Sequence, residues 1–150
     1  MQLPPCGLYR TTGPIGTIPA GRLVYFHNHG NPGPGLYLPA GWKQNRMQVG
    51  EKGTLLPNPD DVRYLEPLPP EGLYRVVEAF HCCEKRCREY QPEDLVQLGY
   101  DGSGQALLFV PELIDGMFAI PDRGRIVDHH TLDKIRRLRI AQSQRSDDAH

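Results

Sequence analysis

The sequence predicts an all-β protein built from two tandem, pseudo-symmetric copies of one small β-barrel. Residues 23–39 and 95–111 each contain an apolar strand, a glycine-rich turn and a second apolar strand that ends at a proline, which is the pattern of a β-hairpin. Matching leucine, glycine and proline positions are all 72 residues apart, since 95 − 23, 102 − 30, 108 − 36 and 111 − 39 give the same number. A constant offset of this kind indicates an internal duplication.

Three further pairs of segments support the duplication. The sequence Gly-Leu-Tyr-Arg occurs at residues 7–10 and again at 72–75. Residues 47–53 match 118–124 at an offset of 71, and both segments end on an acidic residue, a basic residue and a glycine. We also align a last strand, residues 62–65 with 135–138, at an offset of 73.

Each copy then holds about five short strands, which close most economically into a small SH3-like β-barrel. We place the first barrel at residues 1–68 and the second at 72–140, joined by the proline-rich linker 67–71. A tether this short predicts that the two units pack together and enlarge their small cores. We expect a helical turn at residues 131–134 and a disordered tail at 141–150.

Composition limits the class of protein. The chain has 16 Gly and 15 Pro among 150 residues, as expected for short strands and tight turns. A formal net charge of −1 provides no overall attraction to nucleic acid or acidic lipid. The first residues lack the basic and apolar regions of a signal peptide, and no apolar run is long enough to span a bilayer. Four cysteines without a secretory signal favour a reducing compartment, and we predict a cytoplasmic protein.

The second unit carries a cysteine-rich insertion at residues 78–90. Twelve residues separate Arg10 from Leu23, whereas 19 separate Arg75 from Leu95, a difference of seven. The extra length contains a histidine and three cysteines, namely His81, Cys82, Cys83 and Cys87. Thiolates and imidazole are zinc ligands, so these four residues are candidates for a zinc site. Loop packing and a reactive thiol are the alternatives.

The hairpin turn of the first unit contains a His-x-His pair that the matching turn of the second unit lacks. His27 and His29 are two residues apart on a strand, so their side chains leave the same face. Such a pair is half of a metal site, but no cysteine or acidic residue lies nearby in the sequence. We interpret both as solvated histidines of a turn.

Two surfaces could bind a partner. Aromatic residues gather near the hairpins, and we select Tyr25, Tyr37, Trp42 and Tyr100 as candidate binding residues. A basic segment at residues 134–139 contains Lys134, Arg136, Arg137 and Arg139, with Arg137 and Arg139 on one face of a strand. That segment could contact phosphate, although basic edge strands are commonly solvated.

No catalytic motif is present, so we expect a non-enzymatic binding or adaptor module that acts through protein partners. One alternative is nucleic-acid binding through the basic strand at residues 134–139. A second alternative is a zinc or thiol site at residues 81–87 with a sensing or catalytic role. We expect no cofactor other than zinc.

Overall fold

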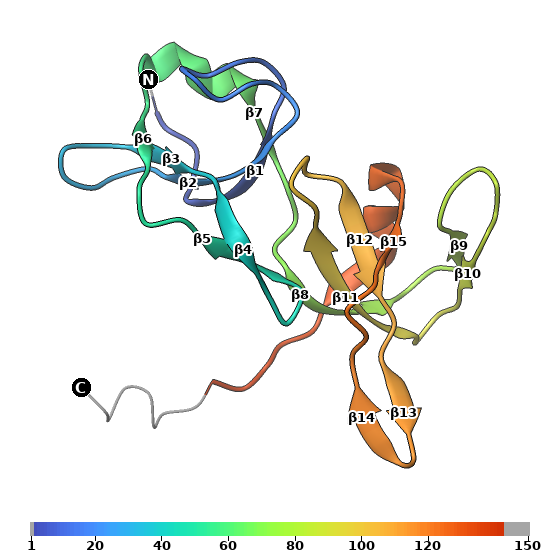
Figure 1. Ribbon diagram of the computed structural model, residues 1–150. Helices are drawn as coiled ribbons and strands as arrows, with labels where there is room; N and C mark the ends of the chain where they lie inside the picture. The colour runs from blue at the N-terminus through green and yellow to red at the C-terminus, as the bar shows by residue number, and fades with distance from the viewer. Residues whose placement is uncertain (1, 143–150) are drawn as a thin grey trace.

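The computed structural model describes residues 2–142, and these residues form short strands and two 3₁₀ helices (Figure 1). The predicted tail at 141–150 lies outside the described residues from residue 143 onward. The elements of the first half are β1 (Gly7–Thr11), β2 (Leu23–His27), β3 (Gly35–Tyr37), β4 (Pro39–Lys43), β5 (Arg46–Val49), β6 (Thr54–Leu55), η1 (Pro59–Tyr64) and β7 (Leu65–Pro67).

The second half repeats this series and adds one small hairpin. Its elements are β8 (Gly72–Val76), β9 (Phe80–His81), β10 (Glu89–Tyr90), β11 (Leu95–Tyr100), β12 (Ala106–Phe109), β13 (Glu112–Ile114), β14 (Met117–Ala119), β15 (Arg125–Ile126), η2 (His129–Lys134) and β16 (Ile135–Arg137). The added hairpin, β9 with β10, lies in the predicted insertion 78–90.

Strand order confirms the repeat. The first half forms an antiparallel sheet in the order β6-β3-β2-β1-β7, and the second forms one in the order β15-β12-β11-β8-β16. Position by position, these are the same strands of the two units. Among residues 2–142 no ladder joins β6 to β7 or β15 to β16, so the sheets stay open and the predicted barrels do not close. The terminal strands β6 and β15 are two residues long, which leaves little backbone for a closing ladder.

Strand register confirms the two predicted hairpins. Tyr25 pairs with Tyr37 between β2 and β3, and Gln97 pairs with Phe109 between β11 and β12. Both partners shift by 72, because 97 − 25 and 109 − 37 are equal. Equivalent residues of the two units therefore pair in the same register.

The proposed alignment of the last strands is wrong by three residues. Residues 62–64 belong to the 3₁₀ helix η1, and the strand β7 begins at Leu65. Its counterpart β16 begins at Ile135, an offset of 70 rather than 73. The helix forms because Asn58 Oδ1 accepts a hydrogen bond from the Asp60 amide and a proline follows this cap. In the second half, the predicted turn at 131–134 is confirmed as part of η2.

The repeated glycine after each acid-base pair has a packing reason. A Cβ atom on Gly53 would lie 2.6 Å from the Tyr37 ring, and one on Gly124 would lie 2.8 Å from the Phe109 ring. Tyr37 and Phe109 are themselves counterparts at an offset of 72. Each unit therefore stacks an aromatic ring of its hairpin directly on a glycine, which no side chain could replace without a shift.

The two halves share one of their two cores. The smaller core lies in the first half and includes Val24, Phe26 and Leu36. The larger core lies in the second half but also buries Leu23, Met47 and Leu68 of the first. The predicted packing of one unit against the other is therefore present. Within the described part of the chain, no helix has the length and apolar character needed to cross a bilayer.

Candidate functional site

Each unit carries a second, smaller hairpin, and these two hairpins are counterparts. Trp42 pairs with Met47 in β4–β5, and Leu113 pairs with Phe118 in β13–β14, an offset of 71 for both partners. Each has a two-residue turn in which both residues have positive φ: 51° and 67° in the first hairpin and 50° and 78° in the second. A type I′ turn requires this backbone, so the two hairpins share turn geometry as well as register.

The first hairpin docks on the second unit. Trp42 Nε1 donates a hydrogen bond of 2.8 Å to the carbonyl oxygen of Tyr100. Asn45 Nδ2 donates to Gln97 Oε1 at 2.9 Å, and Gln97 Nε2 donates back to the Gln44 carbonyl at 3.0 Å. The Met47 side chain enters the larger core and is 7% exposed. We call these contacts the hairpin junction.

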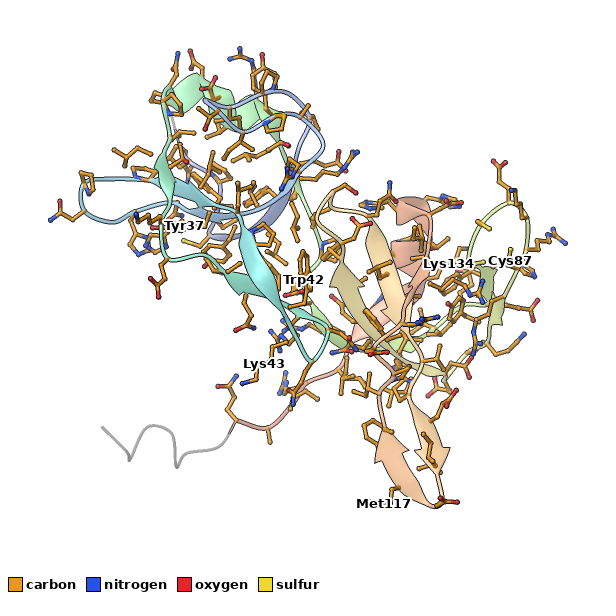
Figure 2. All side chains as sticks on the ribbon, viewed as in Figure 1. Tyr37, Trp42, Lys43, Cys87, Met117 and Lys134 are labelled. Atoms are coloured by element: carbon orange, nitrogen blue, oxygen red, sulfur yellow. The ribbon has the colours of Figure 1, made fainter. Side chains whose placement is uncertain are left out.

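Among the described residues 2–142, the side chains of the second hairpin make no such hydrogen bonds, and the hairpin projects away from the molecule (Figures 1 and 2). Its apolar side chains are exposed on both faces of the ribbon: Leu113 75%, Ile114 55%, Met117 73% and Phe118 57%. We call these four residues the hairpin surface. Clustered exposed apolar side chains indicate an interaction site, whereas single ones need no explanation.

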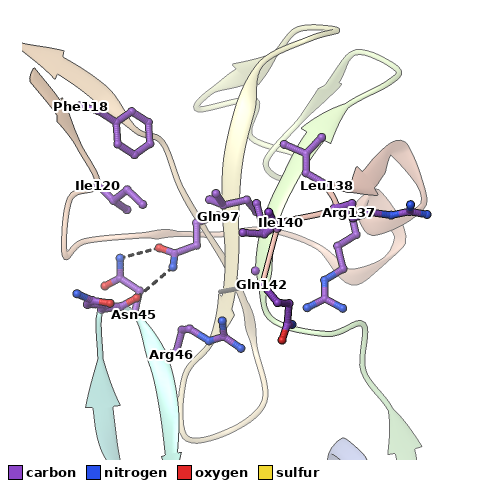
Figure 3. Close-up of a pocket in the computed structure, with 14 residues that line it drawn as sticks. Asn45, Arg46, Gln97, Phe118, Ile120, Arg137, Leu138, Ile140 and Gln142 are labelled. Carbon is purple, nitrogen blue, oxygen red and sulfur yellow. Dashed lines mark hydrogen bonds between the residues drawn. The ribbon is translucent and has the colours of Figure 1, made fainter. Parts of the chain in front are cut away.

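A groove lies beside this surface. Its volume is about 1140 Å³, and it runs between the tip of β4–β5, the base of β14 and the segment after β16 (Figure 3). Arg46, Arg137 and Arg139 line it together with Phe118, which belongs to the hairpin surface as well. Arg136 instead donates to the Asp133 carbonyl. Arg137 and Arg139 thus share one side of their segment, as their spacing predicts, and they give the groove a positive lining.

One carboxylate at the hairpin junction is buried. Glu71 is 8% exposed, and its Oε2 accepts a 2.9 Å hydrogen bond from the Met47 amide. Burial raises the pKa of Glu71, and this effect is opposed in part by the Met47 hydrogen bond and the charge of Arg46.

The raised pKa of Glu71 predicts a pH-dependent cost in stability. The folded state holds the proton more tightly than the unfolded state, so stability falls as pH rises from the unfolded pKa through the raised one. Glu71→Gln keeps an acceptor for Met47 and removes the charge. We expect this variant to be more stable than the wild type at about pH 7 and equally stable at about pH 3.5. Urea denaturation at both pH values measures the difference, and Glu112→Gln is the control that removes an exposed negative charge.

The predicted aromatic binding residues do not form one surface. Tyr100 is 1% exposed, and its hydroxyl donates to the Pro69 carbonyl, so it is a core residue that anchors the linker. Tyr25 is half-buried against the larger core, and Tyr37 stacks on Gly53. Trp42 is 46% exposed but forms the hairpin junction. A role for Tyr25, Tyr37 or Trp42 in ligand binding stays a prediction.

The insertion brings its three cysteines together. The Sγ atoms of Cys82, Cys83 and Cys87 lie within 4.8 Å of one another, in the loop that carries the Cys87 label in Figure 2. A hydrogen bond from Cys82 lowers the pKa of Cys83, and the interaction with Cys83 raises the pKa of Cys87. His81 is not part of this group of ligand atoms, and its Nε2 lies 3.1 Å from Glu89 Oε2 instead.

Two features were not predicted from the sequence. The apolar residues of β13–β14 were not selected as candidate binding residues. The sequence alignment matches Phe118 with Met47, and Met47 is buried in the structure. Cys6 lies 3.7 Å from His27 Nδ1 and 3.9 Å from His29 Nδ1, measured from its Sγ atom. Cys6 is more than 20 positions from either histidine, so only the pairing of β1 with β2 brings it near them.

Comparison with protein-family models, curated protein sequences and solved structures finds no match to this chain.

Proposed function

We propose that the protein is a non-enzymatic binding module that docks to a protein partner through the hairpin surface. The observation that carries this proposal is the difference between two equivalent hairpins. The first, β4–β5, buries Met47 against a neighbouring unit, whereas the second, β13–β14, exposes Phe118 at the same position. A hairpin that serves as a docking element inside the molecule is suited to the same task between molecules.

The surroundings define the chemistry of the partner. Leu113 and Phe118 pair on one face of the ribbon, and Ile114 and Met117 pair on the other. A cleft that admits the ribbon would desolvate both faces, and aromatic and methionine side chains are common anchors of interfaces. The arginines of the adjacent groove favour an acidic segment next to that cleft.

Photo-crosslinking tests this proposal. A photo-reactive amino acid in place of Met117, at the tip of the hairpin, should capture one protein in cells, and the same amino acid at Leu55 should not. Leu55 is the control because it is also an exposed apolar residue, at 51%. The double variant Leu113→Asp/Phe118→Asp should abolish co-purification of the captured protein, whereas Leu55→Asp should not.

Equal capture from both positions, or co-purification that survives the two aspartates, would contradict the proposal. Near-ultraviolet circular dichroism of each variant separates lost binding from lost folding. The exposed positions predict unchanged spectra and stability changes within about 0.5 kcal/mol.

A second candidate function is zinc binding by the insertion, favoured by the three clustered thiols. Zinc held by Cys82, Cys83 and Cys87 would order the loop, because the binding free energy adds to folding. We expect Cys83→Ser to lose one equivalent of zinc and to lower the thermal midpoint of the zinc-loaded protein only. Elemental analysis of protein purified without a histidine tag measures the metal. An unchanged metal content and midpoint would reduce these cysteines to loop packing.

Nucleic-acid binding through residues 134–139 stays a prediction with weaker support. Lys134 is paired with Glu78 at 3.1 Å, and Arg136 is bonded to backbone carbonyls. Arg137 in the groove also donates to a backbone carbonyl, that of Glu71 at 3.3 Å, so within residues 2–142 Arg46 and Arg139 remain for phosphate. No detectable affinity for RNA or DNA at low salt would exclude this alternative, because phosphate contacts strengthen as salt falls.

A further inference from the structure

We propose that Cys6, His27 and His29 form a zinc site on the first unit, with three protein ligands and a fourth position open to solvent. Their ligand atoms all lie within 4.8 Å of one another. This cluster is separate from the hairpin surface and from the three thiols of the insertion, and it does not depend on the proposed function.

The spacing of the ligand atoms fits a metal of this size. Zinc–sulfur bonds of about 2.3 Å and zinc–nitrogen bonds of about 2.0–2.1 Å at tetrahedral angles place sulfur and nitrogen about 3.6 Å apart. Cys6 Sγ is 3.7 Å from His27 Nδ1 and 3.9 Å from His29 Nδ1. Small side-chain movements would close these distances around one ion. A thiolate with two imidazoles is a ligand set that suits zinc.

The strands hold these residues in place. Cys6 immediately precedes β1, and His27 ends β2, the strand that pairs with it. His27 and His29 extend from the same side of the chain, and their rings are 4.1 Å apart between centroids. The ligands therefore come from two neighbouring segments of one sheet, so zinc would fasten the N-terminal segment to the β2–β3 loop.

Asn28 supplies the surrounding hydrogen bonds. Its backbone amide donates to Cys6 Sγ at 3.3 Å, and its Nδ2 donates to the Pro4 carbonyl at 3.1 Å. The backbone amide contact can persist on a thiolate and orient it toward a metal. Asn28 Oδ1 lies 3.2 Å from Cys6 Sγ and 2.7 Å from His29 Nδ1, and zinc would replace these two hydrogen bonds because it takes the same sulfur and nitrogen atoms. Zinc binding would release the Cys6 thiol proton to solvent and leave the His29 proton on Nε2.

The duplication explains why the site occurs in one unit only. The counterparts of Cys6 and His27 are Glu71 and Gly99, at offsets of 65 and 72 that follow the β1–β8 and β2–β11 registers. In the second unit, the hairpin β4–β5 covers this face: Glu71 accepts from the Met47 amide, and Gly99 faces the Asn45 carbonyl. Among residues 2–142, no hairpin makes these contacts with the first unit. His27 is half-buried and His29 is exposed, so the cluster is accessible to a metal ion.

Cobalt spectroscopy on a variant with a single cysteine tests this site. The chain has four cysteines, so Cys82→Ala/Cys83→Ser/Cys87→Ser leaves Cys6 as the only thiol. Addition of Co²⁺ should then produce a thiolate-to-cobalt charge-transfer band with a stoichiometry of one, and Zn²⁺ should displace it. His27→Asn and His29→Asn should each weaken cobalt binding at least tenfold, and Cys6→Ser should abolish the band.

A second measurement uses the otherwise native chain, in case the triple variant fails to fold. Native mass spectrometry after zinc loading should show one zinc fewer for Cys6→Ser than for wild type, and Cys83→Ser should retain the zinc held by Cys6. Equal zinc content in wild type and Cys6→Ser would overturn the proposal. So would a cobalt band that survives both histidine substitutions, because a lone cysteine would then be the only ligand.

Discussion

Replacing Gly99 with alanine should destabilise the protein by about 2 kcal/mol, because it pushes the first hairpin off the second unit. A Cβ atom at this position would lie 2.8 Å from the Asn45 carbonyl oxygen and 3.2 Å from the Phe109 ring. The closer contact is to backbone, which cannot rotate away as a long side chain can. The methyl group must therefore displace β4–β5, and with it the hydrogen bonds that join Asn45 to Gln97.

Gly102→Ala is the matched control for this substitution. A Cβ atom there would lie 3.8 Å from the Trp42 ring, which is an ordinary van der Waals distance. Both changes lower the entropy of the unfolded chain equally, so a difference between them reports the junction. Urea denaturation measures both variants. Equal stabilities of the two variants would mean that the β4–β5 hairpin does not lie this close to β11 in solution.

The hairpins could be predicted because the sequence contains them twice. Gly-Leu-Tyr-Arg places the same tyrosine in both units, and each tyrosine hydroxyl donates to a proline carbonyl four residues earlier, Tyr9 to Pro5 and Tyr74 to Pro70. Gly53 and Gly124 were matched as turn residues, and their common role under an aromatic ring explains the match. Where a short segment occurs twice in the sequence, its local contacts occur twice in the structure.

Closure and long-range contacts could not be predicted in the same way. Five strands per unit suggested a closed barrel, but strand number does not determine whether two-residue edge strands pair. The final strand was aligned three residues too early because an apolar, β-branched residue such as Val62 suits a strand equally well. Its 3₁₀ helix is set by the Asn58 cap upstream. Cys6 meets His27 through strand pairing, which residue spacing alone does not reveal.

The different roles of the two small hairpins also required the structure. Met47 and Phe118 are counterparts at an offset of 71, and both are apolar, so the sequence treats them alike. In the structure Met47 is 7% exposed and packs in the larger core, whereas Phe118 is 57% exposed. Equivalent positions in a repeat can therefore stabilise the fold in one copy and remain free in the other.

This difference predicts that truncating Met47, the smaller side chain, costs more stability than truncating Phe118. Met47→Ala should cost about 2–4 kcal/mol, because it removes buried contacts and leaves a cavity between the two units. Phe118→Ala removes a larger side chain but should change stability by less than about 0.5 kcal/mol, because that residue is already 57% exposed. Chemical denaturation of both variants measures the contrast.

The same pair links stability to binding. If β13–β14 docks only in a complex, Phe118→Ala should leave the isolated protein intact and weaken co-purification of the partner captured through Met117. Met47→Ala should instead lower stability, and it should reduce partner binding only to the extent that the protein unfolds. A loss of stability in Phe118→Ala comparable to that in Met47→Ala would show that the second hairpin is packed within the molecule. The hairpin surface would then be unavailable to a partner, and the proposed docking would fail with it.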